Sequence, residues 1–448
     1  MLFVQLVDED LGCASYLIGD EEAGVAVVVD PSLSVDPLLR EVERRGLLLT
    51  HVLETHTHAD HVSGHGRLGL ELELPVHVHP AAEPEFPYRS LADGQKLEVG
   101  AVVLTVLHTP GHRPEHCSFT VTDRSRADEP WLVLTGDSLF VGEAARPDLA
   151  VNPLEGARGL RQSLRRLGEL ADGVEVHPGH VAGSMCGAGM SAKPSSTIGF
   201  ERRFNPAFVL SNGLEEDFLA ASAAGAGLRP PNVERIVALN RGPFLAAPPP
   251  LRPVGSAGDA LVLDVRPARV SAAGHIPGAI NVPLETRGFG TRAGFVLLAG
   301  EAVVLHAASP QQAQLAAQRL HAVGYLELAG YLEGASADER LDSVELDDLE
   351  RLLEQGEVDV LDVREADERD AGYIPGSRHV PYRLVRALGG ELGGGRPVIT
   401  ICESGARAGV AASILAAAGV DARPVLDGGM SAWRARGNET IEFRRCGG

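Results

Sequence analysis

The second half of the chain repeats itself, and this repeat limits the folds that are possible there. Residues 262–266 and 360–364 both read VLDVR, and the segments 274–278 and 372–376 share a Gly-x-Ile-Pro-Gly pattern at the same offset. Chance does not produce several matches at one spacing. We therefore expect two copies of one domain, each of about 100 residues.

A Pro-rich segment separates this repeat from the first half. Residues 245–258 include three consecutive prolines, which neither a helix nor a central strand accepts, so the segment predicts a semi-rigid linker. The 448 residues suggest about three domains at ~150 residues each. We place these domains at residues 1–244, 259–338 and 339–448.

The pattern of the first domain is that of an α/β protein. Short Val- and Leu-rich runs, expected to be strands, end close to Gly, Pro or Asp at 25–29, 102–107 and 131–134. An amphipathic helix is predicted at 155–172, and further helices are predicted between 200 and 240. Because polar residues follow each strand end, the functional site is expected on loops beyond the strands.

Composition excludes several classes of protein. The net charge of −21 argues against nucleic acid or an anionic membrane as a partner. No apolar run reaches the roughly 20 residues needed to span a bilayer, and the N-terminus lacks the features of a signal peptide, so we expect a cytoplasmic protein. Five cysteines, an odd number, indicate free thiols and no disulfide framework.

Histidine is concentrated in the first domain, where the segment 55–61 reads THTHADH. Three imidazoles and a carboxylate within a few residues suit zinc, iron or manganese, and a loop at a strand end could direct them toward one point. Further candidates follow later strand-like runs. The complete set is His56, His58, Asp60, His61, His112, Asp137 and His180.

This order of motifs resembles the metallo-β-lactamase superfamily, which implies an αββα sandwich with metals at one edge. Within it, the glyoxalase II thioesterases imply two metals held by all seven residues. The persulfide dioxygenases imply one Fe(II) held by His56, His112 and Asp137, with the other four orienting ligands and substrate or marking a lost second metal site. The ligand types alone do not decide between them.

Other segments favour the dioxygenases. Residues 142–149 and 183–203 resemble persulfide dioxygenases fused to rhodanese domains. The resemblance implies that Cys186 lies near the iron, where it could hold a sulfane sulfur, and it makes Arg146 a candidate substrate-binding residue, although a packed loop Cys and a structural Arg are equally compatible. We expect Cys13 and Cys117 to be structural, and Cys446 to be incidental.

The second repeat copy carries a candidate nucleophile. A predicted strand at 398–401 leads into Cys402, a Gly-containing loop with Arg407, and an Ala-rich helix. Backbone amides and the positive end of the helix dipole lower the pKa of a thiol so placed. A buried core Cys is the alternative, but the Cys-x₄-Arg spacing resembles the rhodanese active-site loop and implies sulfur transfer.

Two departures qualify the rhodanese resemblance. Glu403 follows Cys402 where many thiosulfate-using rhodaneses have a basic residue. In the first copy, Ala307 and Gln312 take the places of Cys402 and Arg407, so this copy cannot carry sulfur covalently and is expected to be a spacer or docking domain. Both copies are expected to be doubly wound parallel-sheet domains.

The resemblances together imply an Fe(II) enzyme that oxidises a low-molecular-weight thiol persulfide with O₂ to sulfite, coupled to sulfur transfer that forms or uses thiosulfate. We expect one Fe(II) per chain and a homo-oligomer. One alternative is a binuclear zinc thioesterase of the glyoxalase II type with attached sulfurtransferase modules. Another is that the rhodanese copies only dock other proteins.

Overall fold

The computed structural model of the chain describes residues 1–147, 152–181, 191, 193–224, 228–334 and 339–443. The chain divides into two compact units. The first contains Met1–Pro248 and His321–Gly324, and the second contains Pro249–Leu320 and Tyr325–Gly448. Among the described residues, no helix is both long and apolar enough to cross a bilayer.

The first unit is built on two six-stranded sheets with the orders β1-β2-β3-β4-β5-β6 and β14-β13-β10-β9-β8-β7. The first sheet contains β1 (Leu2–Val7), β2 (Ala14–Asp20), β3 (Val25–Val29), β4 (Leu48–Leu53), β5 (Val76–Val78) and β6 (Arg89–Ser90). The second contains β7 (Lys96–Val99), β8 (Val102–His108), β9 (Cys117–Asp123), β10 (Leu132–Gly136), β13 (Glu175–Pro178) and β14 (Ser196–Thr197). The predicted strands correspond to β3, β8 and β10, with small differences at their ends.

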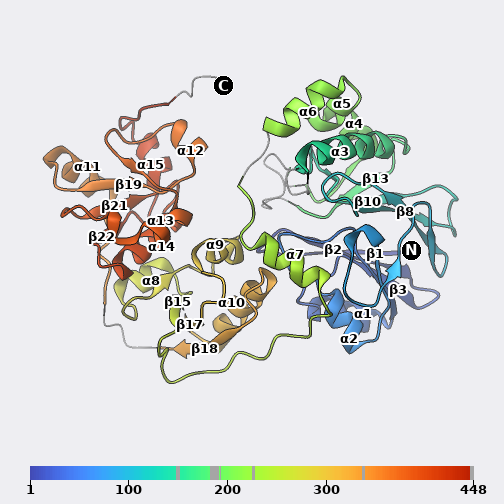
Figure 1. Cartoon of the computed structure of the whole chain (residues 1–448), viewed down its shortest axis with the longest axis horizontal. Helices are drawn as coiled ribbons and strands as arrows, with labels where there is room; N and C mark the ends of the chain where they lie inside the picture. Colours follow the sequence, from blue (N-terminus) through green and yellow to red (C-terminus); the bar gives the residue numbers. More distant parts are fainter. Residues whose placement is uncertain (148–151, 182–190, 192, 225–227, 335–338, 444–448) are drawn as a thin grey trace. The chain divides into compact units, whose positions relative to one another are not determined.

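The two sheets pack face to face and helices cover their outer faces, which gives four layers. Side chains alternate along each strand between the core and the outer face. Tyr16 and Ile18 of β2 pack with Phe119 of β9 in the core between the sheets, whereas Leu17 faces the other side. That outer face of the first sheet is covered by α1 (Asp36–Arg45) and α2 (His65–Glu71). The second sheet is covered by α3 (Pro153–Leu167), α4 (Ile198–Phe204), α5 (Pro206–Ser211) and α6 (Glu215–Ala224). Figure 1 shows this order of layers, which confirms the predicted αββα sandwich.

The second unit contains two four-stranded parallel sheets with the same topology. The first copy has the order β16-β15-β17-β18, and the second copy has the order β20-β19-β21-β22. The strands of the first are β15 (Leu261–Asp264), β16 (Ile280–Asn281), β17 (Val303–Ala307) and β18 (Leu328–Glu333). Those of the second are β19 (Asp359–Asp362), β20 (Arg378–His379), β21 (Val398–Ile401) and β22 (Ala422–Pro424).

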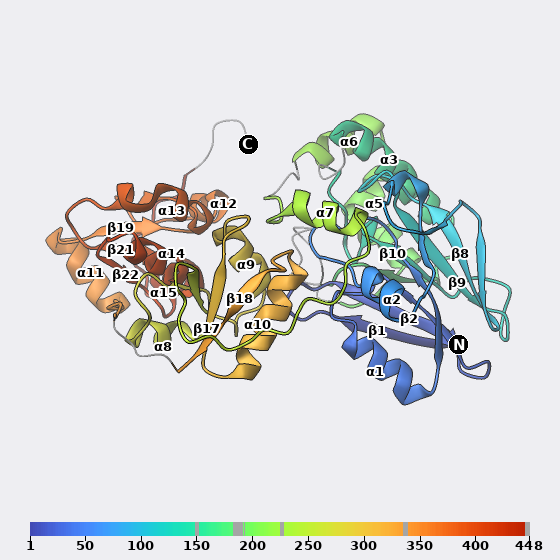
Figure 2. The ribbon, with the colours of Figure 1, turned by 60° about the horizontal axis from the view of Figure 1, so that its bottom comes forward.

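Helices cover both faces of these sheets, as Figure 2 shows. In the second copy, Ile399 and Ile401 pack with residues of α11 (Leu346–Gln355) and α15 (Gly429–Ala435). On the opposite face, the Thr400 hydroxyl donates to the Ala408 carbonyl of α14 (Ala406–Ala417) at 2.9 Å. The predicted doubly wound fold is therefore confirmed.

Strand register fixes which residues of the two copies are equivalent. Asp264 of β15 pairs with His306, and Asp362 of β19 pairs with Ile401. Because the two aspartates hold the same position in the repeated VLDVR motif, the residue that follows His306 in the first copy is equivalent to the residue that follows Ile401 in the second. Ala307 therefore occupies the place of Cys402, as the sequence predicted.

Part of the segment predicted to be a linker is paired with the sheet of the first copy. The amide of Val254 donates to the Tyr331 carbonyl, and the amide of Tyr331 donates to the Arg252 carbonyl, both at 2.9 Å. Tyr331 lies in β18 at the edge of its sheet, where unpaired backbone groups accept such a partner. The end of the segment is thus held to the sheet.

Candidate metal centre and sulfur-transfer site

The candidate metal-binding residues lie on loops that follow four strands of the first unit. His56, His58, Asp60 and His61 come after β4, at one end of the first sheet. The second sheet contributes the other three after β8, β10 and β13, namely His112, Asp137 and His180. All except Asp60 are buried. The site is thus assembled from both sheets of the sandwich.

Three of these residues form a group whose donor atoms face one another. His56 Nε2 and His112 Nε2 lie 3.8 and 3.7 Å from Asp137 Oδ2. One potential donor atom of each residue lies within 4.8 Å of the others. His56 Nε2 and Asp137 Oδ2 are buried and have no hydrogen-bond partner, which is costly in a folded protein unless an ion binds there. The group therefore fits a bound metal ion.

Hydrogen bonds of the Nδ1 atoms of His56 and His112 explain why their Nε2 atoms carry lone pairs. The Thr55 hydroxyl donates to Asp30 Oδ2 at 2.8 Å, so it accepts from His56 Nδ1 at 2.9 Å. His112 Nδ1 lies 3.2 Å from the Arg146 carbonyl, which can only accept. Each ring is thereby fixed with its proton on Nδ1 and its lone pair on Nε2, the arrangement that orients imidazole ligands toward a metal.

Charges at the group also favour metal binding. Burial lowers the pKa of His56 well below its usual value, and the neighbouring His58 and His112 rings lower it further. Burial likewise lowers the pKa of His112. For Asp137, burial alone would raise the pKa, but His180 and His112 outweigh it, so the carboxyl pKa lies below its usual value. Two neutral imidazoles and one carboxylate result at neutral pH.

We expect the substitution Thr55→Val to weaken metal binding about 10- to 100-fold, because His56 loses the partner that fixes its tautomer. Competition with a coloured chelator measures the affinity. Thr50→Val is the matched control, since Thr50 lies in the preceding strand and its hydroxyl donates to the Ala26 carbonyl, away from the candidate ligands. Equal metal affinities in both variants would contradict this role of Thr55.

His116, which the sequence reasoning did not select, positions Asp137. Its Nε2 accepts from the Asp137 amide at 3.0 Å, and its Nδ1 lies 2.9 Å from the Thr109 hydroxyl. Burial lowers the pKa of His116 to about 3, which keeps the ring neutral. Gly136, with φ +47°, makes this contact possible, because a Cβ there would lie 2.6 Å from His116 Nε2.

His58 is held by two carboxylates. Its Nε2 lies 3.1 Å from Glu54 Oε2 and 3.4 Å from Asp30 Oδ1, while its Nδ1 is buried without a partner. Burial and His61 oppose protonation of this ring, but the two carboxylates outweigh them and raise its pKa to about 9. Neither carboxylate was selected from the sequence, although Asp30 ends a predicted strand.

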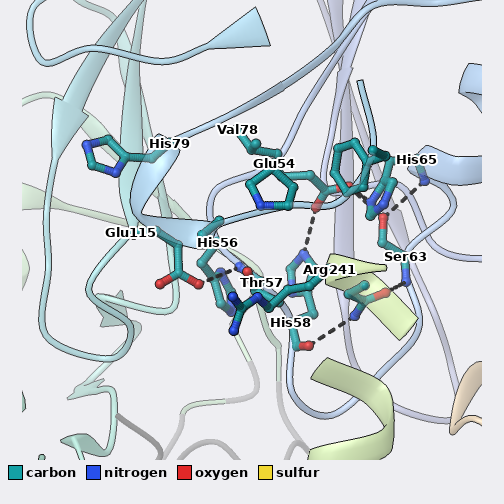
Figure 3. A pocket seen from close by; sticks show the side chains of 14 residues that line it. Glu54, His56, Thr57, His58, Ser63, His65, Val78, His79, Glu115 and Arg241 are labelled. Carbon is teal, nitrogen blue, oxygen red and sulfur yellow. Dashed lines mark hydrogen bonds and ion pairs between the residues drawn. The ribbon is translucent and has the colours of Figure 1, made fainter. Parts of the chain in front are cut away.

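A pocket adjoins His56 and His58 (Figure 3). Its lining combines apolar side chains, among them Val78 and Phe86, with polar groups such as His79, Glu115 and Arg241. One oxygen of Glu115 is buried without a hydrogen-bond partner.

The other candidate residues form a second group together with a cysteine that was expected to be structural. Cys13 Sγ lies 3.3 Å from both His61 Nδ1 and His180 Nε2, and 3.7 Å from Asp60 Oδ2. His180 also joins the two groups, because its Nδ1 lies 2.8 Å from Asp137 Oδ1. No metal-ligand spacing in the sequence pointed to Cys13, since it lies far from the histidine motif.

Arg146 and Cys186 are the remaining candidates of the first unit. The Arg146 side chain is buried and donates to the Leu228 carbonyl at 2.8 Å, and its own carbonyl accepts from His112. The structure thus brings its backbone to the metal group. Cys186, like Cys446, lies outside the described residues.

In the second unit, Cys402 lies between β21 and α14, as the sequence predicted. The Gly405 amide donates to its sulfur at 3.1 Å, and the side chain is 1% exposed. Gly405 has φ +109°, and a Cβ at this position would lie 1.9 Å from the Leu426 carbonyl oxygen. The tight loop that delivers an amide to the sulfur therefore requires glycine here.

The charges around Cys402 are paired with one another. Both terminal nitrogens of Arg407 contact Glu368 at 2.6 Å, so this cation is anchored by a carboxylate. Glu403 pairs with Arg434 and with the buried Arg364. The acidic residue that departs from the rhodanese pattern is therefore neutralised by two arginines.

Comparisons with known proteins agree with this architecture. The Metallo-beta-lactamase superfamily profile matches residues 8–180, and the Rhodanese-like domain profile matches residues 253–338 and 345–436. The crystal structure of a metallo-beta-lactamase from Staphylococcus aureus subsp. aureus COL is 30% identical, with a TM-score of 0.68, and the match covers 74% of this chain and 98% of that chain.

Two of the curated relatives that carry the name of an activity each match less than half of the chain. Hydroxyacylglutathione hydrolase of Parasynechococcus marenigrum is 32% identical over 169 residues, which is 37% of this chain and 64% of the relative. The mitochondrial persulfide dioxygenase ETHE1 of Homo sapiens is 29% identical over 209 residues, which is 45% of this chain and 74% of the relative.

The αββα sandwich carries buried groups of histidine and aspartate at one edge. These features define a metal-binding protein built on two packed sheets. The chain belongs to the metallo-beta-lactamase superfamily, and it carries two rhodanese-like domains after the sandwich.

Proposed function

We propose that the first unit is a non-heme Fe(II) persulfide dioxygenase. The observation that carries the proposal is the group of His56, His112 and Asp137, which is a 2-His-1-carboxylate set with lone pairs on facing atoms. Fe(II) bound there supplies open coordination positions for a substrate sulfur and O₂. The overall reaction, RSSH + O₂ + H₂O → RSH + SO₃²⁻ + 2H⁺, releases the thiol and sulfite.

Three further features support this proposal. His58 Nε2 is occupied by Glu54 and Asp30, which leaves the facing group with three members. A pocket with both apolar and polar lining residues adjoins His56 and His58 and would receive the substrate. One curated relative is itself a persulfide dioxygenase. His56 and His112 would hold the ion, while Thr55 and the Arg146 carbonyl keep their rings oriented.

We propose sulfur transfer at Cys402 for the second unit. Its thiolate would attack the outer sulfur of a donor persulfide, break the donor's S–S bond and release the donor thiol, and the resulting Cys402 persulfide would lie against the Gly405 amide. Attack of sulfite on the outer sulfur then breaks the S–S bond and gives thiosulfate and the free thiolate, and the same step can run in reverse. Ala307 excludes this chemistry from the first copy.

A binuclear zinc thioesterase is the second candidate. It is favoured by the unpartnered Nδ1 of His58 and by the second group of potential ligands around Asp60. The relative named hydroxyacylglutathione hydrolase supports it as well. The two candidates require different metals and different substrates.

The deciding experiment uses the full chain loaded with Fe(II) alone. We expect about one iron per chain and consumption of one O₂ per sulfite formed when glutathione persulfide is added. Zinc-loaded protein is assayed in parallel for hydrolysis of a glutathione thioester. Absence of O₂ consumption with every persulfide tested, together with thioester hydrolysis by the zinc form, would replace the first proposal by the second.

A further inference from the structure

The loop that carries His56 depends on side chains from elsewhere for its hydrogen bonds. This segment, residues 55–63, lies between β4 and α2 and is called the histidine loop here. It forms no helix or continuous strand, and all of its residues except Asp60 are buried. A buried amide or carbonyl group without a partner is costly, so other parts of the fold must supply these partners.

Asn240 supplies three of them from far along the chain. It lies in the last turn of α7 (Val233–Arg241), and its side chain is buried. Its Nδ2 donates to the carbonyls of His58 and His61 at 3.0 and 2.8 Å, and its Oδ1 accepts from the Ser63 amide at 2.8 Å. The bonds at His58 and Ser63 are among the dashed lines of Figure 3. One side chain thus fixes the histidine loop at three points.

These bonds also constrain His56, although Asn240 does not touch it. The Thr57 amide donates to Glu115 Oε1 at 3.2 Å, so the backbone is held between His56 and His58 as well. Because planar peptide bonds leave few soft dihedrals in so short a stretch, a shift of the His58 carbonyl would move the His56 ring. The direction of His56 Nε2 toward Asp137 therefore depends on the contacts of the histidine loop.

The brace comes from a part of the chain that lies beyond the matched superfamily region. The Metallo-beta-lactamase profile ends at residue 180, whereas α7 follows much later. The next residue, Arg241, holds a second loop, because its carbonyl accepts from the Glu85 amide at 2.6 Å. Phe244 then stacks on Phe86, with ring centroids 4.8 Å apart. The end of the first unit is thus anchored on both sides of the pocket that adjoins His56.

We propose that Asn240 is a positioning residue of the metal centre. Its amide holds the histidine loop in the conformation in which His56 Nε2 faces Asp137 and His112, so the ligands are already arranged before an ion binds. Ligand groups that are held in place in this way bind an ion more tightly than groups that must first be ordered. This role concerns the metal centre and does not depend on which reaction the centre catalyses.

The test uses the metal-free full chain and Co²⁺, whose visible absorption bands report coordination geometry. We expect Asn240→Ala to weaken Co²⁺ binding about 10- to 100-fold and to shift these bands, because the released carbonyls let the histidine loop relax. Asn240→Asp should have a similar effect. It keeps an acceptor for the Ser63 amide, but it places a second oxygen against two carbonyls that need donors.

Asn205→Ala is the matched control for a loss of stability alone. Asn205 is also buried and also uses both ends of its amide. Its Oδ1 accepts from the amides of Ala207 and Phe208, and its Nδ2 donates to the Glu143 carbonyl and to Glu201. None of these partners belongs to the histidine loop. This variant should unfold at a lower temperature and keep the native Co²⁺ affinity and bands.

Native affinity and bands in Asn240→Ala would overturn the proposal. Equal losses of affinity in both alanine variants would also overturn it, because they would indicate a general loss of stability, and so would a native chain that binds no Co²⁺. A native chain that binds Co²⁺ but, when loaded with Fe(II), consumes no O₂ with any persulfide would refute only the proposed reaction. The comparison of Co²⁺ affinities would then still decide the role of Asn240.

Discussion

Asp137→Asn is expected to lower iron affinity by about 100-fold or more and to abolish O₂ consumption in the full chain. The introduced amide has the shape of the carboxylate and can still accept from His180. Its NH₂ group, however, replaces an oxygen that faces His56 and His112. It would donate to their lone pairs and close the group without an ion. Iron content and an oxygen electrode measure the two effects.

Asp60→Asn is the control for this result. Asp60 belongs to the second group, so its replacement should leave one iron per chain and retain O₂ consumption. Sulfur transfer at Cys402 provides an internal reference for folding, because it takes place in the other unit. Iron binding by Asp137→Asn equal to that of the native chain would remove Asp137 from the ligand set.

Cys402→Ser should reduce sulfur transfer from a persulfide to sulfite by at least about 10³-fold, while O₂ consumption stays unchanged. A hydroxyl at this position can accept the Gly405 amide, but it cannot carry a sulfane sulfur as a thiolate does. Thiosulfate formation measures the effect. Cys117→Ser, a buried thiol outside the rhodanese-like domains, should leave the transfer rate at the native value.

Persistence of transfer in Cys402→Ser would show that the second rhodanese-like domain does not act as the carrier. The docking function considered for both copies would then gain support. If O₂ consumption also fell in this variant, sulfur exchange between the two units would have to contribute to the first reaction. The two assays on one variant therefore separate the carrier role from any coupling.

Local patterns in the sequence predicted most of the architecture. The repeat predicted two equivalent domains. Strand register confirms the equivalence, because Ala307 has the same position in the first copy as Cys402 has in the second. The apolar runs before the candidate ligands predicted strands, because a buried strand and a polar loop differ sharply in composition. These features depend on neighbours along the chain, which a sequence displays directly.

The supporting contacts of the site were not predictable in the same way. Asp30 and Thr55 touch through their side chains although they lie on loops after different strands, and Cys13 meets His180 across a backbone bridge. Such pairs depend on how strands are ordered and on which side chains face each other. One sequence gives residue types but not these long-range contacts.

The ligands of the first group come from loops of both sheets, and this affects how long the protein survives in a cell. His56 belongs to a loop of the first sheet, and His112 and Asp137 belong to loops of the second. An unfolded chain has no such arrangement, so the ion binds only after the sheets have docked. At a hundredfold excess of ion over its dissociation constant, this linkage adds about 2.7 kcal/mol to stability. Depletion of the metal ion would therefore expose the empty protein to proteolytic turnover and lower its abundance, not only its rate of catalysis.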